Sequence, residues 1–508
     1  MSLEGSLSIA ASGLLNINRH LAVVSQNVAN VGTPGYARQV LPQSSMTAAD
    51  QGMGVRSAVA QRQIDLHLQQ AALYQASTVA GLDATAAALS GVEVVHGATG
   101  AGDDLPSLLG RVEDSFIRLA TDTASQPNQA AVVAAADALA RQVRGLDAAY
   151  GAARQSAQDA VVADVATLNA TLRRIGGLSD SIVQVRAMGL SSADLENQRD
   201  AARGELAGLI DVRAMTAPSG ELLLATSSGL SLPTRFIDLP FAVDAATLDA
   251  TSYYPGGGAP AVTLGGIDVT TRLGAGRLGA NLGLRDDVLP TFQAELDEFA
   301  ITLSRRFEAQ GLRLFSDPAG AVPAGGGTPV QDGYVGYAGI IGLNRAVADD
   351  PALVRDGTHD VADDPTGATA FQRNPADGPA GFATLVGRVL SHGFGTEIRA
   401  GVAQPAPARA GLGPTGLLEA PYAPPVGLAA LASALVAAQT RASSDAAGAV
   451  GSARGLQTAL DGKLAAGSAV SVDQEMTVML QLQAAYAANA RVIAAVRTMM
   501  DQTLQLLR

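Results

Sequence analysis

The chain has 508 residues, no cysteine and a formal net charge of −13 at neutral pH. The lack of cysteine excludes a disulfide framework and a thiolate metal site, and an acidic chain with scattered arginines is not typical of a nucleic-acid-binding protein. Because 47% of the residues are hydrophobic, the chain can fill the cores of two to four domains.

The first forty residues predict one long helix. Apolar residues recur at alternating spacings of four and three, which is the heptad pattern of a helix that packs lengthwise on another helix. This N-terminal seam consists of Leu3, Leu7, Ala10, Leu14, Ile17, Leu21, Val24, Val28 and Val31. A Pro-Gly turn from Thr33 to Tyr36 predicts that the helix ends near residue 31.

The middle of the chain alternates between helical and strand-like segments. A polar connector with short strands is expected at 41–62, followed by helices near 64–90, 105–119, 129–176 and 195–209. Residues 212–285 are β-rich between Gly and Pro turns, as in short antiparallel strands. Asp286 or Asp287 is expected to cap a helix that runs to Gly311, with an apolar stripe of Leu289, Phe292, Leu296, Phe299, Leu303 and Phe307. Residues 312–425 are rich in Gly, Pro and Asp and predict a small irregular or β insertion, after which a helix returns at about 427–466.

The last forty residues predict a second long helix with its own heptad seam. Ser471 and Gln474 have the spacing of a capping box at its start. The large apolar residues of this C-terminal seam are Met476, Met479, Tyr486, Ile493, Met500, Leu504 and Leu507. Because neither terminal helix carries many charges, we expect both to have neighbours on more than one side, and we predict that the two seams form a self-assembly interface.

These elements predict a mainly α fold with a smaller β part. We expect an elongated multidomain protomer with paired terminal coiled-coil helices, a helical-bundle domain with short antiparallel strands, and a small irregular or β insertion. The predicted divisions are 1–40, 41–311, 312–425, 426–470 and 471–508; the first and last form the terminal coiled coil, and 426–470 returns to the helical domain.

Two motifs at opposite ends of the chain resemble those of known proteins. Asn27 and the run from Val28 to Gln39, which contains Asn30, Thr33, Pro34, Gly35 and Tyr36, resemble the N-terminal signature of bacterial flagellar rod, hook and hook-associated proteins. The tail from Gln481 to Ile493 resembles the matching C-terminal signature. The resemblance is closest to the hook-associated protein 1 family, the first hook–filament junction proteins. A segment at 195–200 resembles an internal motif of the same family.

The resemblance implies a structural subunit of the flagellum that polymerises through its terminal helices. It implies self-assembly into a ring or tube, contacts with the hook protein and with the second hook-associated protein, and an export chaperone on the C-terminal helix. It also implies export through the flagellar type III apparatus to an extracellular position. The runner-up within this class is a flagellar hook or rod subunit.

The N-terminus gives no sign of a secretory leader. Glu4 stands where a positive n-region would be, and the apolar residues are spaced apart, so we expect no cleaved signal peptide. No apolar run reaches the length of a membrane span, so no membrane contact is expected either.

A function of another class would be a nucleotide-dependent soluble enzyme. Residues 274–279 match the dinucleotide pattern Gly-x-Gly-x-x-Gly, and Glu295 follows at a suitable distance. Turns between short strands are the more ordinary use of such glycines. The five histidines lack ligand spacing, and the acidic residues at 349, 350, 356, 360, 363 and 364 lack the pattern of a calcium loop. We therefore predict no catalytic site, no metal and no cofactor.

Overall fold

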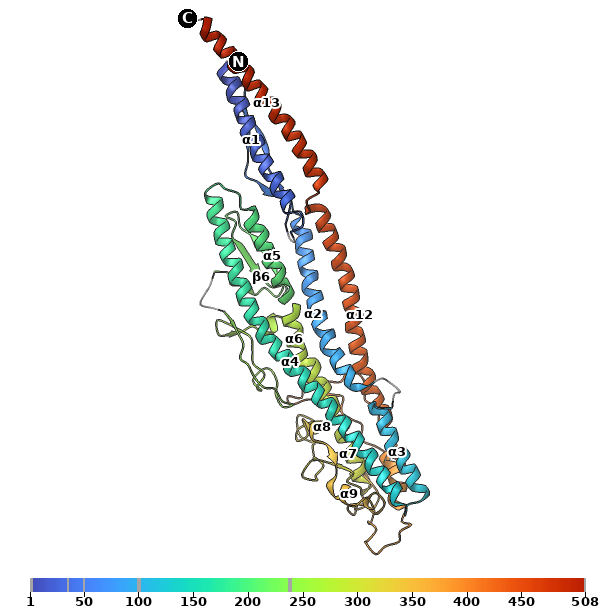
Figure 1. Ribbon diagram of the computed structural model, residues 1–508. Coiled ribbons are helices and arrows are strands. Elements are labelled where there is room, and N and C mark those ends of the chain that lie inside the picture. Colours follow the sequence, from blue (N-terminus) through green and yellow to red (C-terminus); the bar gives the residue numbers. More distant parts are fainter. Residues whose placement is uncertain (1–2, 34–35, 49–50, 98–101, 236–239, 507–508) are drawn as a thin grey trace. The chain divides into compact units, whose positions relative to one another are not determined.

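The computed structural model describes residues 3–33, 36–48, 51–97, 102–235 and 240–506. Helices make up 59% of the chain and strands 10%, which confirms the mainly α fold with a smaller β part. The helices are α1 Leu3–Ala29, α2 Leu66–His96, α3 Leu105–Thr121, α4 Gln126–Ala187, α5 Ala193–Leu209, α6 Gly276–Gly283, α7 Leu289–Ala309, α8 Tyr337–Ile340, α9 Arg345–Asp349, α10 Leu353–Asp356, α11 Thr384–Arg388, α12 Leu428–Ser468 and α13 Val472–Leu506 (Figure 1).

The strands are short and form small sheets of two or three strands. They are β1 Gln39–Val40, β2 Gln43–Ala48, β3 Gln51–Ser57, β4 Gln61–Arg62, β5 Arg213–Thr216, β6 Leu222–Ala225, β7 Ser231–Leu232, β8 Phe241–Ala242, β9 Thr263–Leu264, β10 Ile267–Asp268, β11 Phe315–Ser316, β12 Gly342–Leu343, β13 Glu397–Arg399, β14 Val402–Ala403, β15 Ala410–Leu412 and β16 Leu418–Glu419. The sheets are β1-β4, β2-β3, β5-β6-β7, β8-β9-β10, β11-β12, β13-β14 and β15-β16. Each strand pair with a defined register is antiparallel, as the turn-rich sequence predicts.

The chain forms two compact units. Unit 1 contains 1–80, 166–241 and 452–508, and unit 2 contains 81–165 and 242–451. Helices α2, α4 and α12 each contribute one part to unit 1 and the other part to unit 2. Both the segment predicted as one helical domain, 41–311, and the helical return at 426–470 therefore supply residues to both units.

Unit 1 contains the pair of terminal helices and a small α/β layer. In the layer, α5 and the later part of α4 bury Leu172, Ile182 and Leu206 near the sheet β5-β6-β7. Leu222 and Leu224 of β6 are buried whereas Leu223 is 56% exposed, which is the alternation of a strand with one covered face.

A glycine allows the backbone to approach α4 closely. At Gly176 of α4, an added Cβ would lie 1.7 Å from the carbonyl oxygen of Thr234, just after β7. No side chain can occupy this position without moving the following segment away from the helix.

Unit 2 has a core centred on α7. The predicted apolar stripe of this helix is buried, and the ring of Phe307 lies 5.3 to 6.0 Å, between centroids, from those of Phe116, Phe315 and Phe394. Such aromatic pairs add to the roughly 1.5–3 kcal/mol gained by burying each large apolar side chain. Residues 312–425 share this core, since Tyr337, Ile341 and Phe371 belong to it.

The predicted cap of α7 is wrong. The helical run begins ten residues before Asp286, at Gly276, and continues through a π-helical turn at Leu284–Val288 into α7. Asp286 therefore lies within the helical run, where its carboxylate pairs with Arg285 at 2.7 Å. The start at Gly276 depends on Gly279, because an added Cβ there would lie 2.4 Å from the backbone carbon of Gly274.

Candidate functional site: the terminal helix pair and its base

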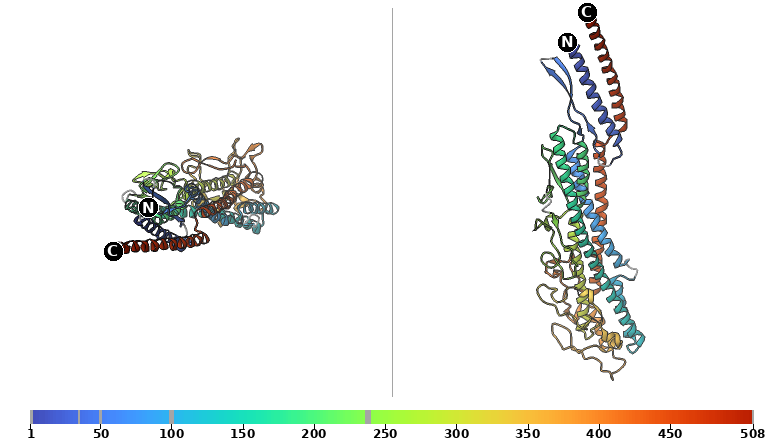
Figure 2. Two further views of the ribbon diagram at one scale, coloured as in Figure 1. Left: turned by 90° about the horizontal axis from the view of Figure 1, so that it is seen from above. Right: turned by 60° about the vertical axis from the view of Figure 1, so that its left-hand side comes forward.

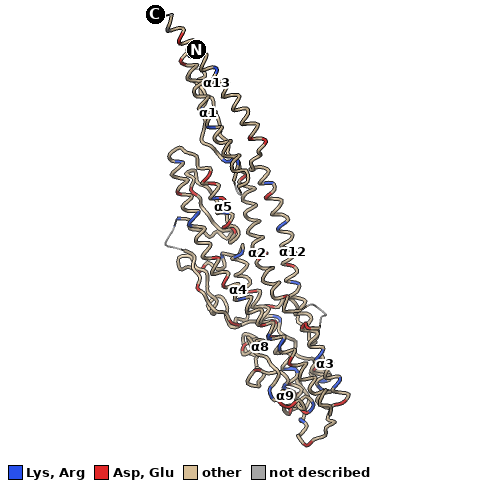
Figure 3. The backbone as a smooth tube through the Cα atoms, viewed as in Figure 1, with Lys and Arg blue, Asp and Glu red and all other residues tan. Residues whose placement is uncertain are grey.

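The two terminal helices lie side by side and run in opposite directions. Figures 1 and 2 show α13 along α1, and Asn489 of α13 lies beside Gly13 of α1. Charged residues are few along α1, which has Glu4 and Arg19, and are spread along α13, which has Asp473, Glu475, Arg491, Arg497 and Asp501 (Figure 3). The predicted pairing of the N- and C-terminal helices is therefore present in the protomer.

The predicted N-terminal seam is the covered side of α1. Ala10, Ile17 and Val24 are buried, and Leu3, Leu7, Leu14, Leu21 and Val28 are half-buried. Val31 is 48% exposed because α1 ends two residues earlier, at Ala29. The heptad pattern thus identified the covered side of this helix from its sequence.

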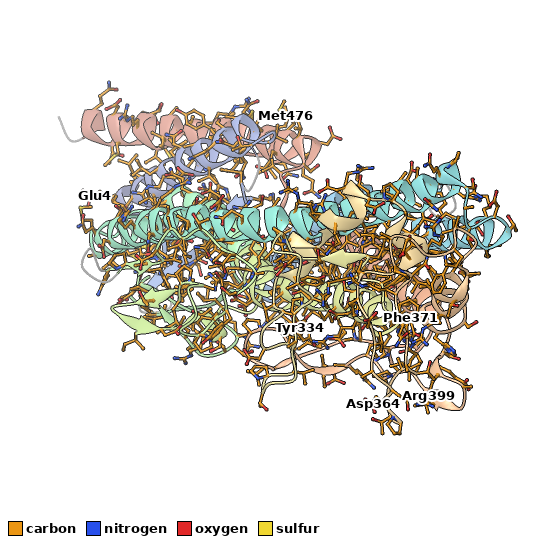
Figure 4. The ribbon with its side chains drawn as sticks, turned by 90° about the horizontal axis from the view of Figure 1, so that it is seen from below. Glu4, Tyr334, Asp364, Phe371, Arg399 and Met476 are labelled. Carbon is orange, nitrogen blue, oxygen red and sulfur yellow. The ribbon has the colours of Figure 1, made fainter. Side chains whose placement is uncertain are left out.

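The covered side of α13 is shifted from the predicted seam by one residue in several turns. Glu475 and Val496 are buried, and Val478, Leu482, Ala485 and Asn489 are half-buried together with the predicted Met479, Ile493 and Met500. Met476 and Tyr486 are exposed by 43% and 42%, and Figure 4 shows Met476 near the start of α13. The side chain of Leu504, and Leu507, lie outside what the structure describes. That the predicted seam residues of α13 form contacts between copies stays a prediction.

The terminal pair has a base where α1 ends and α13 begins, around Asn27, Gln39 and Glu475. Asn27, in the last turns of α1, makes the central contacts of this base. Its side-chain amide donates to the carbonyl oxygen of Gln39 at 2.9 Å, and its Oδ1 accepts from the backbone N–H of Gln39 at 2.9 Å and from the hydroxyl of Tyr36 at 3.0 Å. Asn27 is 1% exposed. One side chain therefore satisfies both backbone groups of Gln39, as a neighbouring strand would.

The rest of the signature turn is arranged around this contact. The backbone N–H of Tyr36 donates to the carbonyl of Thr33 at 3.2 Å, the hydrogen bond of a four-residue turn. The hydroxyl of Thr33 donates to Oδ1 of Asn30 at 3.2 Å. Burial raises the pKa of Tyr36 to about 12, so its hydroxyl keeps the proton that it donates to Asn27. Pro34 and Gly35 lie outside the described residues.

Arg38 connects this signature to the start of the C-terminal helix. Its Nε lies 2.6 Å from Oε1 of Glu475, which is 1% exposed, and its backbone N–H donates to the carbonyl of Ser468 at 2.8 Å. Ser471 caps α13, accepting from the N–H of Gln474 at 3.4 Å. The sequence prediction did not include Glu475, although an acid in the first turn of an otherwise apolar helix is a usable signal.

Residues 194–200 of α5 contact the base of the terminal pair and the connector that follows it. Asp194 accepts hydrogen bonds from Gln26 at 2.6 Å and from Gln39 at 2.8 Å. Arg62 of β4 reaches Glu196 at 2.8 Å and Asp200 at 2.5 Å. The internal motif is therefore structural, since it fastens the connector between α1 and α2 to α5.

Replacing Asn27 by alanine should loosen the base. The change leaves the buried N–H and C=O of Gln39 without partners, and each such group costs about 1–3 kcal/mol. We expect amide exchange at residues 36–41 to become at least tenfold faster, measured by hydrogen–deuterium exchange. Asn30→Ala is the matched control, because the side chain of Asn30 bonds to the carbonyl of Gln26 and to the hydroxyl of Thr33 but not to Gln39. Equal exchange rates in both variants would contradict this role of Asn27.

The dinucleotide pattern does not form a binding site. Gly276 does open a helix, but the nearest strands, β9 and β10, form an antiparallel pair rather than a parallel strand–helix–strand unit. Glu295 lies 16 residues beyond Gly279 in a nearly continuous helical run, roughly 24 Å along its axis. Arg277 within the pattern pairs with Asp164.

Acidic side chains in the segment 349–364 accept hydrogen bonds from nearby backbone N–H groups. Asp360 accepts from the N–H of Arg373 at 2.8 Å, and Asp364 accepts from that of Thr366 at 2.9 Å. The carbonyl of Asp364 accepts from Arg399 at 2.9 Å, and Figure 4 shows these two residues together. No group of three or more possible metal ligands occurs among the described residues.

One helix qualifies the expectation of no membrane span. Among the described residues, only α2 is long and apolar enough over an 18-residue window to cross a membrane by length and composition. Core helices pass the same test, and Leu89 and Val92 of α2 are buried in the core of unit 2.

Two family models match different parts of the chain. The flagellar hook-associated protein FlgK helical domain matches residues 92–318, and the flagellar basal body rod FlgEFG protein C-terminal model matches residues 462–506. The second match includes all of α13.

The curated relatives carry one name. Flagellar hook-associated protein 1 of Bacillus subtilis (strain 168) is 26% identical over 223 residues, 41% of this chain and 43% of that protein. The proteins of that name from Salmonella typhimurium and Escherichia coli (strain K12) are 24% and 23% identical, each over 59% of this chain and over 55% and 56% of their own lengths. The chain thus spans about half the length of the curated relatives it matches.

A solved structure, that of the flagellar hook junction protein FlgK from Burkholderia pseudomallei, aligns with 50% of this chain and 46% of its own. The sequence identity is 18% and the TM-score is 0.41.

Paired terminal helices, together with flagellar domain models at the middle and at the C-terminal end, make this chain similar to structural proteins of the bacterial flagellum. Within that class, the helical-domain match and the relatives agree. Residues 92–318 are similar to the helical domain of flagellar hook-associated proteins, and the curated relatives are named flagellar hook-associated protein 1.

Proposed function

We propose that this chain is a subunit of the hook–filament junction that polymerises through its terminal helices and has no catalytic role. The observation that carries the proposal is the base of the helix pair. Asn27 and Arg38 of the signature connect the segment after α1 to α1 and to α13, and Gln26 and Gln39 connect α1 and this segment to Asp194 of α5. Residues 92–318 of the same chain match the helical domain of hook-associated proteins. Such a base gives the terminal pair a defined origin on unit 1.

The uncovered faces of the pair support assembly with further copies. Large apolar side chains are exposed there: Leu15 on α1, and Leu480, Tyr486, Val492 and Met499 on α13, by 42 to 65%. With so few charges along both helices, these faces gain more from contact with another apolar surface than from water. Sister copies in a ring or tube would supply that surface.

The partners follow from the position at the junction. One end of the assembly would contact the hook protein and the other the second hook-associated protein. Before assembly, an export chaperone would cover the exposed apolar face of α13. The subunit would reach its extracellular position through the flagellar export apparatus without a cleaved signal peptide.

The test is the position of the protein on the flagellum. A copy with a small peptide tag should appear as one band between hook and filament in immunogold micrographs. A copy carrying the tag with Asn27→Ala should appear there in reduced amount, because its terminal pair is poorly anchored. Labelling along the hook or in the rod would overturn the proposal in favour of a hook or rod subunit.

A further inference from the structure

Unit 1 contains a cleft that the assembly role does not use. It has a volume of about 420 Å³ and lies between β4, the end of α4, the start of α5 and β5. Three arginines line it, Arg62, Arg186 and Arg199, together with one acid, Glu196. The exposed apolar side chains of Val59, Leu66 and Leu190 stand at its edge.

The charges around the cleft do not balance. Glu196 pairs with Arg62 at 2.8 Å and with Arg186 at 2.7 Å. Asp200, just behind the cleft, pairs with Arg62 at 2.5 Å and with Arg203 at 3.0 Å. Burial alone would raise the pKa of both carboxyls, but their arginine partners hold it below the usual range, so both are ionised at neutral pH.

With Arg199, four arginines face two carboxylates, an excess of two positive charges. The side chains of Arg62, Asp200 and Arg203 are each less than a tenth exposed, so water screens this excess weakly. Leaving a buried cation without a counter-charge is costly in a folded protein.

Among the described residues, Arg199 makes no ion pair with a carboxylate. It is 3% exposed, and its side chain donates one hydrogen bond, from Nη1 to the carbonyl of Gly220 at 2.8 Å. Its Nε is buried without a partner, and so are Nδ2 of Asn197 and Nε of Arg203. Burial lowers the pKa of Arg199, and the nearby charges of Asp200 and Glu196, which raise it, do not offset this effect. Unused donors, surplus positive charge and an open cleft meet at this side chain.

We propose that the cleft binds an oxyanion, a carboxylate or phosphate group, with Arg199 as its principal donor. A planar guanidinium is suited to hold such a group through two parallel hydrogen bonds. Two sources can supply this group: a small anion in solution, or an acidic side chain of a second copy, whose 47 aspartates and glutamates offer many candidates. This inference does not depend on the position of the protein in the flagellum.

Citrate and phosphate are the probes, titrated into the full chain at constant ionic strength with chloride as the reference anion. We expect saturable binding by isothermal titration calorimetry and slower amide exchange at residues 186–199. Arg199→Gln should weaken binding at least tenfold. The matched control is Arg173→Gln, which removes one exposed arginine from α4 within unit 1.

A second variant keeps the test decisive if Arg199→Gln fails to fold. Thr216→Trp should fill the cleft from β5 while leaving all its charges in place, since Thr216 is exposed and lines the cleft. This variant should also lose binding. Equal binding by the wild type and Thr216→Trp, or no binding beyond that of chloride, would overturn the proposal.

The source of the group is separated by sedimentation velocity. Dissociation of wild-type copies by citrate but not by chloride, together with weaker assembly of Thr216→Trp in the absence of citrate, would assign an acidic side chain of a second copy. Binding of citrate without any effect on assembly would assign a free anion.

Discussion

A chain that lacks residues 471–508 should no longer attach filaments to hooks. The deletion removes α13 and with it the cover of Ala10, Ile17 and Val24 on α1, as well as the partner of Arg38. Exposing three such side chains costs several kcal/mol, on the order of 1.5–3 kcal/mol for a large one, so α1 should lose its fixed position. We expect motility to fall to the level of a strain without the protein, and filament monomers to appear in the medium.

Point variants separate the pairing of the helices from contacts between copies. Val496→Asp places a charge on the covered side of α13, where the valine is 4% exposed, and should reproduce the deletion. Val492→Asp is the matched variant, four residues away and 46% exposed in the protomer. It should leave the pair intact, seen as unchanged amide exchange in α1, but weaken assembly. Normal filament attachment in the deletion strain would contradict the proposed role of the terminal helices.

Glu295→Gln should stabilise unit 2 at pH 8. Burial raises the pKa of Glu295 to about 7, and the hydrogen bond from Gln439 at 3.0 Å does not offset this. Its other oxygen, Oε1, is buried without a partner. In the unfolded chain its pKa is 4.5, so between about pH 4.5 and 7 the folded state holds a proton that the unfolded state has lost. Stability therefore falls as the pH rises through this interval, by about 3 kcal/mol in total.

Glutamine mimics the protonated acid and cannot ionise. The variant should match the wild type at pH 5 and exceed it at pH 8 by up to about 3 kcal/mol. The measurement is the urea midpoint of unit 2 at both values, followed by the near-ultraviolet signal of Tyr150, whose hydroxyl donates to Gln439 at 2.6 Å. Glu308→Gln, a partly exposed acid on the same helix, is the control. A wild-type pH dependence retained in Glu295→Gln would assign the effect to another acid, such as the buried Asp297.

The helices could be predicted because their signals are local. The apolar stripe of α7 and the covered side of α1 follow from periodicity within one segment, and both are buried as expected. The covered side of α13 could not be predicted in the same way. Alanines and larger apolar residues occur on all sides of this helix, so several apolar stripes are compatible with its sequence. The four-and-three spacing of the predicted seam leads to the polar residues Gln483 and Arg497, whereas the covered residues are their neighbours Leu482 and Val496.

The contacts at the base could not be predicted from local patterns. Arg62 lies 134 residues from Glu196 along the sequence, and no periodicity connects them. The resemblance to flagellar proteins identified Asn27 and Tyr36 as signature residues. It did not show which residues these two side chains contact. The start of the helical run at Gly276 was missed because glycine is a poor helix former. Here Gly276 has a positive φ of 72°, and Gly279 allows the backbone of Gly274 to approach closely.

The ion pair between Arg38 and Glu475 joins residues 437 positions apart. A ribosome making this chain releases the arginine 437 residues before the glutamate. Until residue 475 has been made, the base of the terminal pair lacks this ion pair, and closing so long a loop carries an entropic cost. A product that ends before residue 475 would therefore leave Arg38 without its carboxylate partner.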